Sequence, residues 1–116
     1  MQVSRRPRLW HDLQKASAES PFRGCTYREV WVLYRHIVTA KPRFILECGS
    51  GISSIGLANA VLELREEGHE CEFVTMEENA GYYQLLQGIL PPHLPSVCKS
   101  LRSDVATREI RDFRGR

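Results

Sequence analysis

Long hydrophobic runs and closely spaced cysteines are both missing from this sequence of 116 residues. The longest plainly apolar run covers residues 30–33, far short of the roughly 20 residues that a membrane-spanning helix requires. The basic residues near the start of the chain are not followed by the apolar stretch of a secretory signal. We therefore expect a soluble, cytoplasmic protein with no membrane partner.

The cysteines are Cys25, Cys48, Cys71 and Cys98, and no two of them form a C-x-x-C pair. The sequence therefore predicts neither a zinc site nor a redox-active pair, and we expect no bound metal. Cys48 and Cys71 fall within apolar runs that are typical of buried strands. We expect both to be small core residues in a reducing compartment.

An excess of one charge is also missing, because 16 Lys and Arg residues face 14 Asp and Glu residues, for a net charge of +2. This balance argues against nucleic acid or an anionic surface as the main partner and favours a small molecule. With 42% hydrophobic and 26% charged residues, the chain can bury one modest core. Collagen-like, disordered and coiled-coil structures are excluded.

The pattern along the chain predicts a leader over residues 1–24, with a short, loosely attached helix at 10–18, followed by one domain over residues 25–116. Within that domain helical periodicity alternates with short apolar runs that end in turns. We expect an α/β fold with a partial parallel sheet and flanking helices. The expected helices cover 26–39, 53–67 and 80–90, and the expected strands cover 44–48, 71–76 and, at a sheet edge, 97–102.

The first strand runs directly into Gly49-Ser50-Gly51. Glycines at such a turn let the backbone approach a ligand closely, and the following helix, capped by Ser53 or Ser54, presents unpaired N–H groups. A Gly-x-Gly turn is also compatible with an ordinary connection between a strand and a helix.

Acidic residues follow the next two strands. Glu77 lies 26 positions after Gly51, where a carboxylate can accept hydrogen bonds from a ribose diol. Glu78 would take this place if the strand slipped by one residue, and both could be solvated turn residues. Asp104 follows the third strand, where it could accept a hydrogen bond from an exocyclic amine of a base, although a helix cap is an equal alternative.

Taken in order over residues 27–104, these features resemble a class I S-adenosylmethionine-dependent methyltransferase. Residues 41–54 look like the first motif of that family, and residues 74–77 look like the strand-ending acid of its second motif. The resemblance implies a Rossmann-like three-layer sandwich that binds S-adenosyl-L-methionine. It implies that the methionine end of the cofactor lies against the turn and the acid before it, which are Glu47, Gly49, Ser50 and Gly51. It also implies that Glu77 binds the ribose hydroxyls and that Asp104 contacts the adenine amine.

The sequence departs from the family in length. A complete class I fold contains a seven-stranded sheet, whereas this chain ends after the third expected strand. We expect the N-terminal half of a longer enzyme, or a chain that completes its sheet with a second copy or another partner, since the first strand would otherwise have an unpaired edge. The methyl acceptor and the catalytic residues are not encoded in these motifs.

Two other functions remain open. An NAD(P)-dependent oxidoreductase would use the same layout but needs Gly-x-Gly-x-x-Gly, whereas Ser54 stands at the third glycine position and Gly56 comes two residues late. The other is a non-catalytic nucleoside-binding or interaction module, in which the basic ends of the chain could contact an acidic partner.

Overall fold

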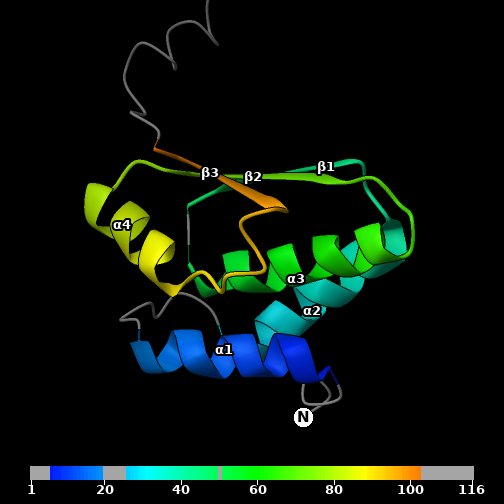
Figure 1. Cartoon of the computed structure of the whole chain (residues 1–116), viewed down its shortest axis with the longest axis horizontal. Helices are drawn as coiled ribbons and strands as arrows, with labels where there is room; N and C mark the ends of the chain where they lie inside the picture. Colours follow the sequence, from blue (N-terminus) through cyan, green and yellow to red (C-terminus); the bar gives the residue numbers. More distant parts are fainter. Residues whose placement is uncertain (1–5, 20–25, 50, 103–116) are drawn as a thin grey trace, which may run out of the picture.

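The structure, a computed structural model, describes residues 6–19, 26–49 and 51–102. In these ranges, helices flank a parallel three-stranded sheet (Figure 1). The elements are α1 (Pro7–Glu19), α2 (Tyr27–Ala40), β1 (Phe44–Cys48), α3 (Ile52–Glu66), β2 (Glu72–Glu77), α4 (Ala80–Ile89) and β3 (Cys98–Arg102). This is the predicted α/β arrangement, and it is consistent with a Rossmann-like fold.

The ends of α2 show how local chemistry sets the boundaries of an element. Thr26 Oγ1 accepts a hydrogen bond from the Glu29 amide at 3.2 Å, and the Glu29 carboxylate accepts one from the Thr26 amide at 2.9 Å. This reciprocal capping satisfies two amides that have no partner inside the helix. At the other end Lys41 adopts a left-handed conformation with φ 52°, and Pro42 prevents the helix from continuing.

The strands lie in the order β1-β2-β3, all parallel, with Glu47 opposite Thr75 and Met76 opposite Leu101. Among the described residues β3 is an edge strand, as predicted, and β1 forms the other edge. Both crossovers step across the sheet in the same direction, so the right-handed rule places α3 and α4 on one face (Figure 1). We call that side the covered face. We call the opposite side, which carries Phe44, Leu46 and Leu101, the open face.

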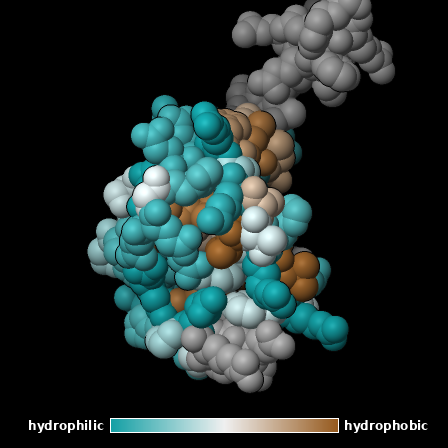
Figure 2. All heavy atoms as spheres, turned by 90° about the vertical axis from the view of Figure 1, so that its right-hand side faces the viewer, coloured by the Kyte–Doolittle hydropathy of each residue, from teal (hydrophilic) through white to brown (hydrophobic). Residues whose placement is uncertain are grey.

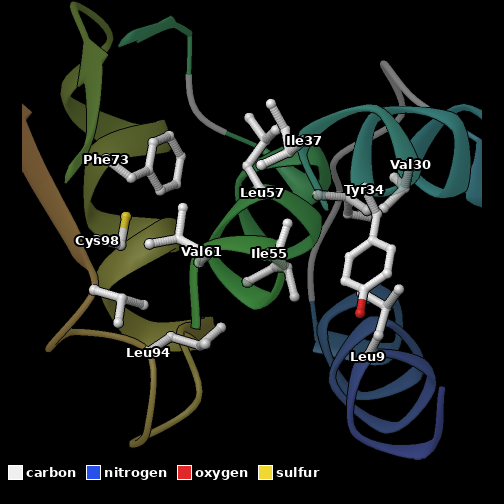
Figure 3. Close-up of a cluster of buried hydrophobic side chains, with 14 of the residues drawn as sticks. Leu9, Val30, Tyr34, Ile37, Ile55, Leu57, Val61, Phe73, Leu94 and Cys98 are labelled. Carbon is white, nitrogen blue, oxygen red and sulfur yellow. The ribbon is translucent and has the colours of Figure 1, made fainter. Parts of the chain in front are cut away.

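The core lies between the covered face and α3, and it continues behind α3 to α2 and α1. Figure 3 shows Phe73 and Cys98 from the sheet facing Val61 of α3. Gly56 lets α3 approach α2 closely, since a Cβ at this position would overlap Val30 Cγ1. Much of the hydrophobic core is therefore built around α3 itself.

Helix α1 is longer and more firmly packed than the short, loose helix that the sequence predicted. Leu9, Leu13 and Ala16 are buried, because their spacing of four and three residues brings them to one face of the helix. Its other contacts include two hydrogen bonds at 3.0 Å between the Arg8 guanidinium and the Glu66 carboxylate. Isolated apolar residues in the sequence thus become a continuous stripe against α3.

The prediction for the cysteines was right for Cys71 and wrong for Cys48. Cys71 and Cys98 are buried, whereas Cys48 is exposed. Cys48 shares its side of the edge strand with Phe44 and Leu46, because side chains alternate along a strand. It therefore lies on the open face. Cys25 lies outside the described residues.

Candidate functional site

The candidate site lies where β1 and β2 end, around the glycine turn. Gly49 has φ 100°, a conformation that a residue with a side chain rarely adopts. Its amide donates a hydrogen bond of 2.7 Å to the Met76 carbonyl, which extends the pairing of β1 with β2 beyond the last strand residue. The turn is thereby held against the end of β2. Ser50 lies outside the described residues.

The residue that precedes α3 as its N-cap is Gly51, so the prediction that Ser53 or Ser54 caps the helix was wrong. Ser54 is the third residue of the helix, and its Oγ accepts a hydrogen bond of 3.0 Å from the Gly51 amide. The Ser54 amide in turn donates to the Gly51 carbonyl at 3.0 Å. Ser54 therefore accepts the hydrogen bond of the Gly51 amide from the third position of the helix, and not from the N-cap position.

Glu47 lies beneath this turn and accepts hydrogen bonds from three hydroxyl groups. Ser53 Oγ donates to Oε2 at 2.6 Å, while Ser54 Oγ and Thr75 Oγ1 donate to Oε1 at 2.5 and 2.8 Å. Burial raises the pKa of the Glu47 carboxyl, and the nearby negative charge of Glu77 raises it further, although the three hydroxyl donors oppose the shift. Glu47 is therefore an acid held by short hydrogen bonds at the base of the turn.

Glu77 is the last residue of β2 and is 7% exposed, whereas its neighbour Glu78 is exposed. Because side chains alternate along the strand, Glu77 shares the covered face with Phe73 and Thr75. Its Oε2 accepts a hydrogen bond of 3.0 Å from the Asn79 amide. The structure thus gives the buried position at the strand end to Glu77 and places Glu78 in solvent.

Two predicted site residues are therefore brought together. Glu47 and Glu77 lie on the covered face of adjacent parallel strands at their carboxyl ends, close enough for the charge of one to act on the other. Ligands of open parallel sheets bind beyond this edge. Two carboxylates beside a glycine turn suit a ligand that offers hydroxyl or ammonium donors. Asp104 lies outside the described residues, shortly after β3.

The sequence analysis missed the hydroxyl partners of Glu47, and in particular Thr75. Thr75 stands opposite Glu47 in the sheet register, so only the pairing of two distant strands brings them together. The signal available in the sequence was a threonine between the apolar residues Val74 and Met76 of the strand. A polar residue in such a position needs a partner when it is buried.

A second polar cluster was also missed. Asp12 of α1 is 1% exposed, and its Oδ2 lies 3.0 Å from Asn59 Nδ2 and 2.8 Å from His93 Nε2. These contacts join α1, α3 and the loop after α4. The cluster offsets the cost of burying a carboxylate. Asn59, a polar residue within the apolar sequence of α3, was the signal for it.

No described helix has the length and apolar character needed to cross a membrane, and the described residues contain no group of three or more His, Cys, Asp or Glu side chains that could hold a metal ion. No model of a protein family matches the chain, and no curated protein matches its sequence.

Proposed function

We propose that this chain is the cofactor-binding half of a class I S-adenosylmethionine-dependent methyltransferase. The observation that carries the proposal is the position of Glu47 and Glu77 on adjacent strand ends, beside a turn in which Gly49 has positive φ. An acid at each strand end and a glycine turn between strand and helix are what the resemblance requires. The order β1-β2-β3, with β1 at an edge that a further strand could extend, also supports it.

In this proposal the turn of Gly49, Ser50 and Gly51 binds the amino-acid end of S-adenosyl-L-methionine, with Glu47 beneath it. Glu77 accepts hydrogen bonds from the ribose hydroxyls, since an ionised carboxylate only accepts them. Asp104 meets the adenine amine. The bound cofactor supplies an electrophilic methyl group, and these residues bind and orient it so that an acceptor can approach in line. The acceptor and the catalytic residues are not assigned.

The oxidoreductase alternative is less well supported by the site. The third glycine of a dinucleotide-binding motif would stand at Ser54, whose hydroxyl is instead hydrogen-bonded to Gly51 and Glu47. Gly56 is buried against Val30 in the contact between α2 and α3, which accounts for that glycine without a phosphate.

The open face favours a second candidate, a nucleoside-binding module that works in association with another polypeptide. Phe44 and Leu46 are each 53% exposed and Leu101 is 39% exposed. In Figure 2 hydrophobic side chains reach the surface near the top of the molecule, at the level of the sheet. The second half of a longer domain or a second copy of the chain would each cover this surface.

Calorimetric titration of the 116-residue chain with S-adenosylhomocysteine and, separately, with NADH tests the proposal. The proposal predicts saturable binding of S-adenosylhomocysteine and none of NADH. Binding of NADH alone would contradict it and favour the oxidoreductase. A folded chain that binds neither compound, but has the mass of a dimer in solution, would contradict the proposal and favour an interaction module that associates through the open face and binds no nucleoside.

A further inference from the structure

A continuous chain of hydrogen bonds connects the glycine turn to the middle of the sheet. The Gly51 amide donates to Ser54 Oγ at 3.0 Å, Ser54 Oγ donates to Glu47 Oε1 at 2.5 Å, and Thr75 Oγ1 donates to the same oxygen at 2.8 Å. We call these four residues the hydroxyl chain. It joins the start of α3, the end of β1 and the middle of β2, which are elements separated in the sequence.

Ser54 is the link on which the connection to the turn depends. Its single hydroxyl group accepts from the turn and donates to the carboxylate, so the two bonds polarise each other in the same direction. The side chain is 0% exposed, and a buried hydroxyl that loses its partners carries a full desolvation cost. Ser53 differs in this respect, because it donates to the other carboxylate oxygen, Oε2, and has no bond to Gly51 among those that the structure gives.

The turn is therefore held on both sides of Ser50. Before it, the Gly49 amide is bonded to the Met76 carbonyl, and after it the Gly51 amide is bonded to Ser54. The Gly51 amide is directed into the protein by this bond, so it does not serve as a donor to a ligand. The hydroxyl chain instead fixes the conformation of the backbone that a ligand would contact.

We propose that Ser54 is a positioning residue, which fixes the ligand-binding turn through Gly51 and Glu47 without touching the ligand itself. This inference rests on the proposed function for its effect on cofactor affinity. Preorganisation of this kind lowers the entropy that binding must remove. Loss of the serine hydroxyl should thus weaken ligand binding even though no contact with the ligand is removed.

The decisive comparison is Ser54→Ala against Ser53→Ala, because each removes one hydroxyl donor from Glu47 and only the first disconnects Gly51. We expect Ser54→Ala to weaken the binding of S-adenosylhomocysteine by roughly 10-fold, because the backbone of about one residue of the turn would then have to be ordered on binding. We expect Ser53→Ala to weaken it less than about 3-fold. Equal losses in the two variants would overturn the inference, since a purely electrostatic or stabilising role of the hydroxyls would affect both alike.

A second measurement, amide hydrogen exchange at Gly51 followed by nuclear magnetic resonance, does not depend on the ligand. Exchange should be accelerated roughly 10-fold or more in Ser54→Ala and unchanged in Ser53→Ala, because only the first loses the acceptor. Unchanged exchange in Ser54→Ala would overturn the inference. If the wild-type chain fails to bind S-adenosylhomocysteine, the proposed function fails, while this exchange comparison still decides whether Ser54 fixes the turn.

Ser54→Cys provides a second variant if Ser54→Ala does not fold. It keeps the size of the side chain, but a thiol is a weak donor and a weak acceptor, so both hydrogen bonds of Ser54 are weakened. Accelerated exchange at Gly51 in Ser54→Cys is the expected result. Exchange as slow as in the wild type would contradict the role of the hydroxyl chain.

Discussion

The two faces of the sheet are both apolar, but they differ in what covers them. On the covered face Phe73 is 2% exposed beneath α3, while on the open face Phe44 is 53% exposed. Parallel sheets normally carry helices on both faces, and their strands are accordingly apolar on both sides. The open face has the composition of a covered surface and no cover among the described residues. The described part of the chain therefore leaves apolar strand residues exposed on this face.

Replacing one phenylalanine on each face tests this difference most strongly. We expect Phe73→Ala to lower the free energy of unfolding by about 3–5 kcal/mol, the usual cost of a large cavity in a core. Phe44→Ala should lower it by less than about 1 kcal/mol, as for a surface position. Urea unfolding followed by circular dichroism measures both values. Similar losses in the two variants would mean that the open face is covered in solution.

A smaller effect is expected where α3 packs on α2, behind the covered face. Gly56→Ala would force its methyl group into Val30, and such overpacking costs about 1–3 kcal/mol of unfolding free energy. Gly88→Ala is the matched control, because a methyl group added at this position of α4 would meet nothing within 4 Å, and alanine is the better helix former. Thermal unfolding of both variants gives the comparison. A neutral Gly56→Ala would contradict the close approach of the two helices.

The smallest expected effect is a change of the unfolding free energy with pH. It distinguishes Glu47, a buried acid on the covered face, from an acid at the surface. Burial raises the pKa of Glu47 above its ordinary value of 4.5, so the folded protein binds more protons than the unfolded chain just above that pH. The wild type should accordingly lose stability relative to Glu47→Gln as the pH rises through this window. Unfolding free energies of the two proteins between pH 4 and pH 7, about the range in which a carboxyl of raised pKa titrates, test the sign.

Glu66→Gln is the control with the opposite sign. Hydrogen bonds from Arg8 lower the pKa of Glu66, so its contribution to stability is present above the ordinary value and is lost as the pH falls. The wild type should therefore gain stability relative to Glu66→Gln as the pH rises. The same slope for both variants would show that the environment of Glu47 differs from the one described.

The parallel sheet and the order of elements could be predicted because each strand is a short apolar run bounded by a turn, as residues 44–48 illustrate. The position of Glu77 at the end of β2 followed from the same pattern. The firm packing of α1 could not be predicted, because Leu9 and Leu13 are buried only through tertiary contacts, and the sequence does not show that α1 packs against α3. Cys48 was misplaced because periodicity alone does not reveal which face of a strand is left open.

The candidate site could be predicted only in outline. Acids and glycines at strand ends are visible in the sequence, but the partners of Glu47 are set by tertiary structure. Thr75 reaches it across the register of two strands, and Ser54 reaches it because the helix begins at Gly51 and not at a serine. Contacts of this kind depend on how distant segments are aligned, which local patterns do not record.

The most direct test of the proposed cofactor site is the affinity of Glu77→Gln for S-adenosylhomocysteine, measured by calorimetry beside the wild type and Glu78→Gln. Adjacent acids of equal charge differ here only in position, one buried at the strand end and the other exposed. We expect Glu77→Gln to weaken binding by roughly 10- to 100-fold, since hydrogen bonds to a charged acceptor are lost, and Glu78→Gln to bind as the wild type does. Unchanged affinity in Glu77→Gln, or a larger loss in Glu78→Gln, would contradict the assignment of the site.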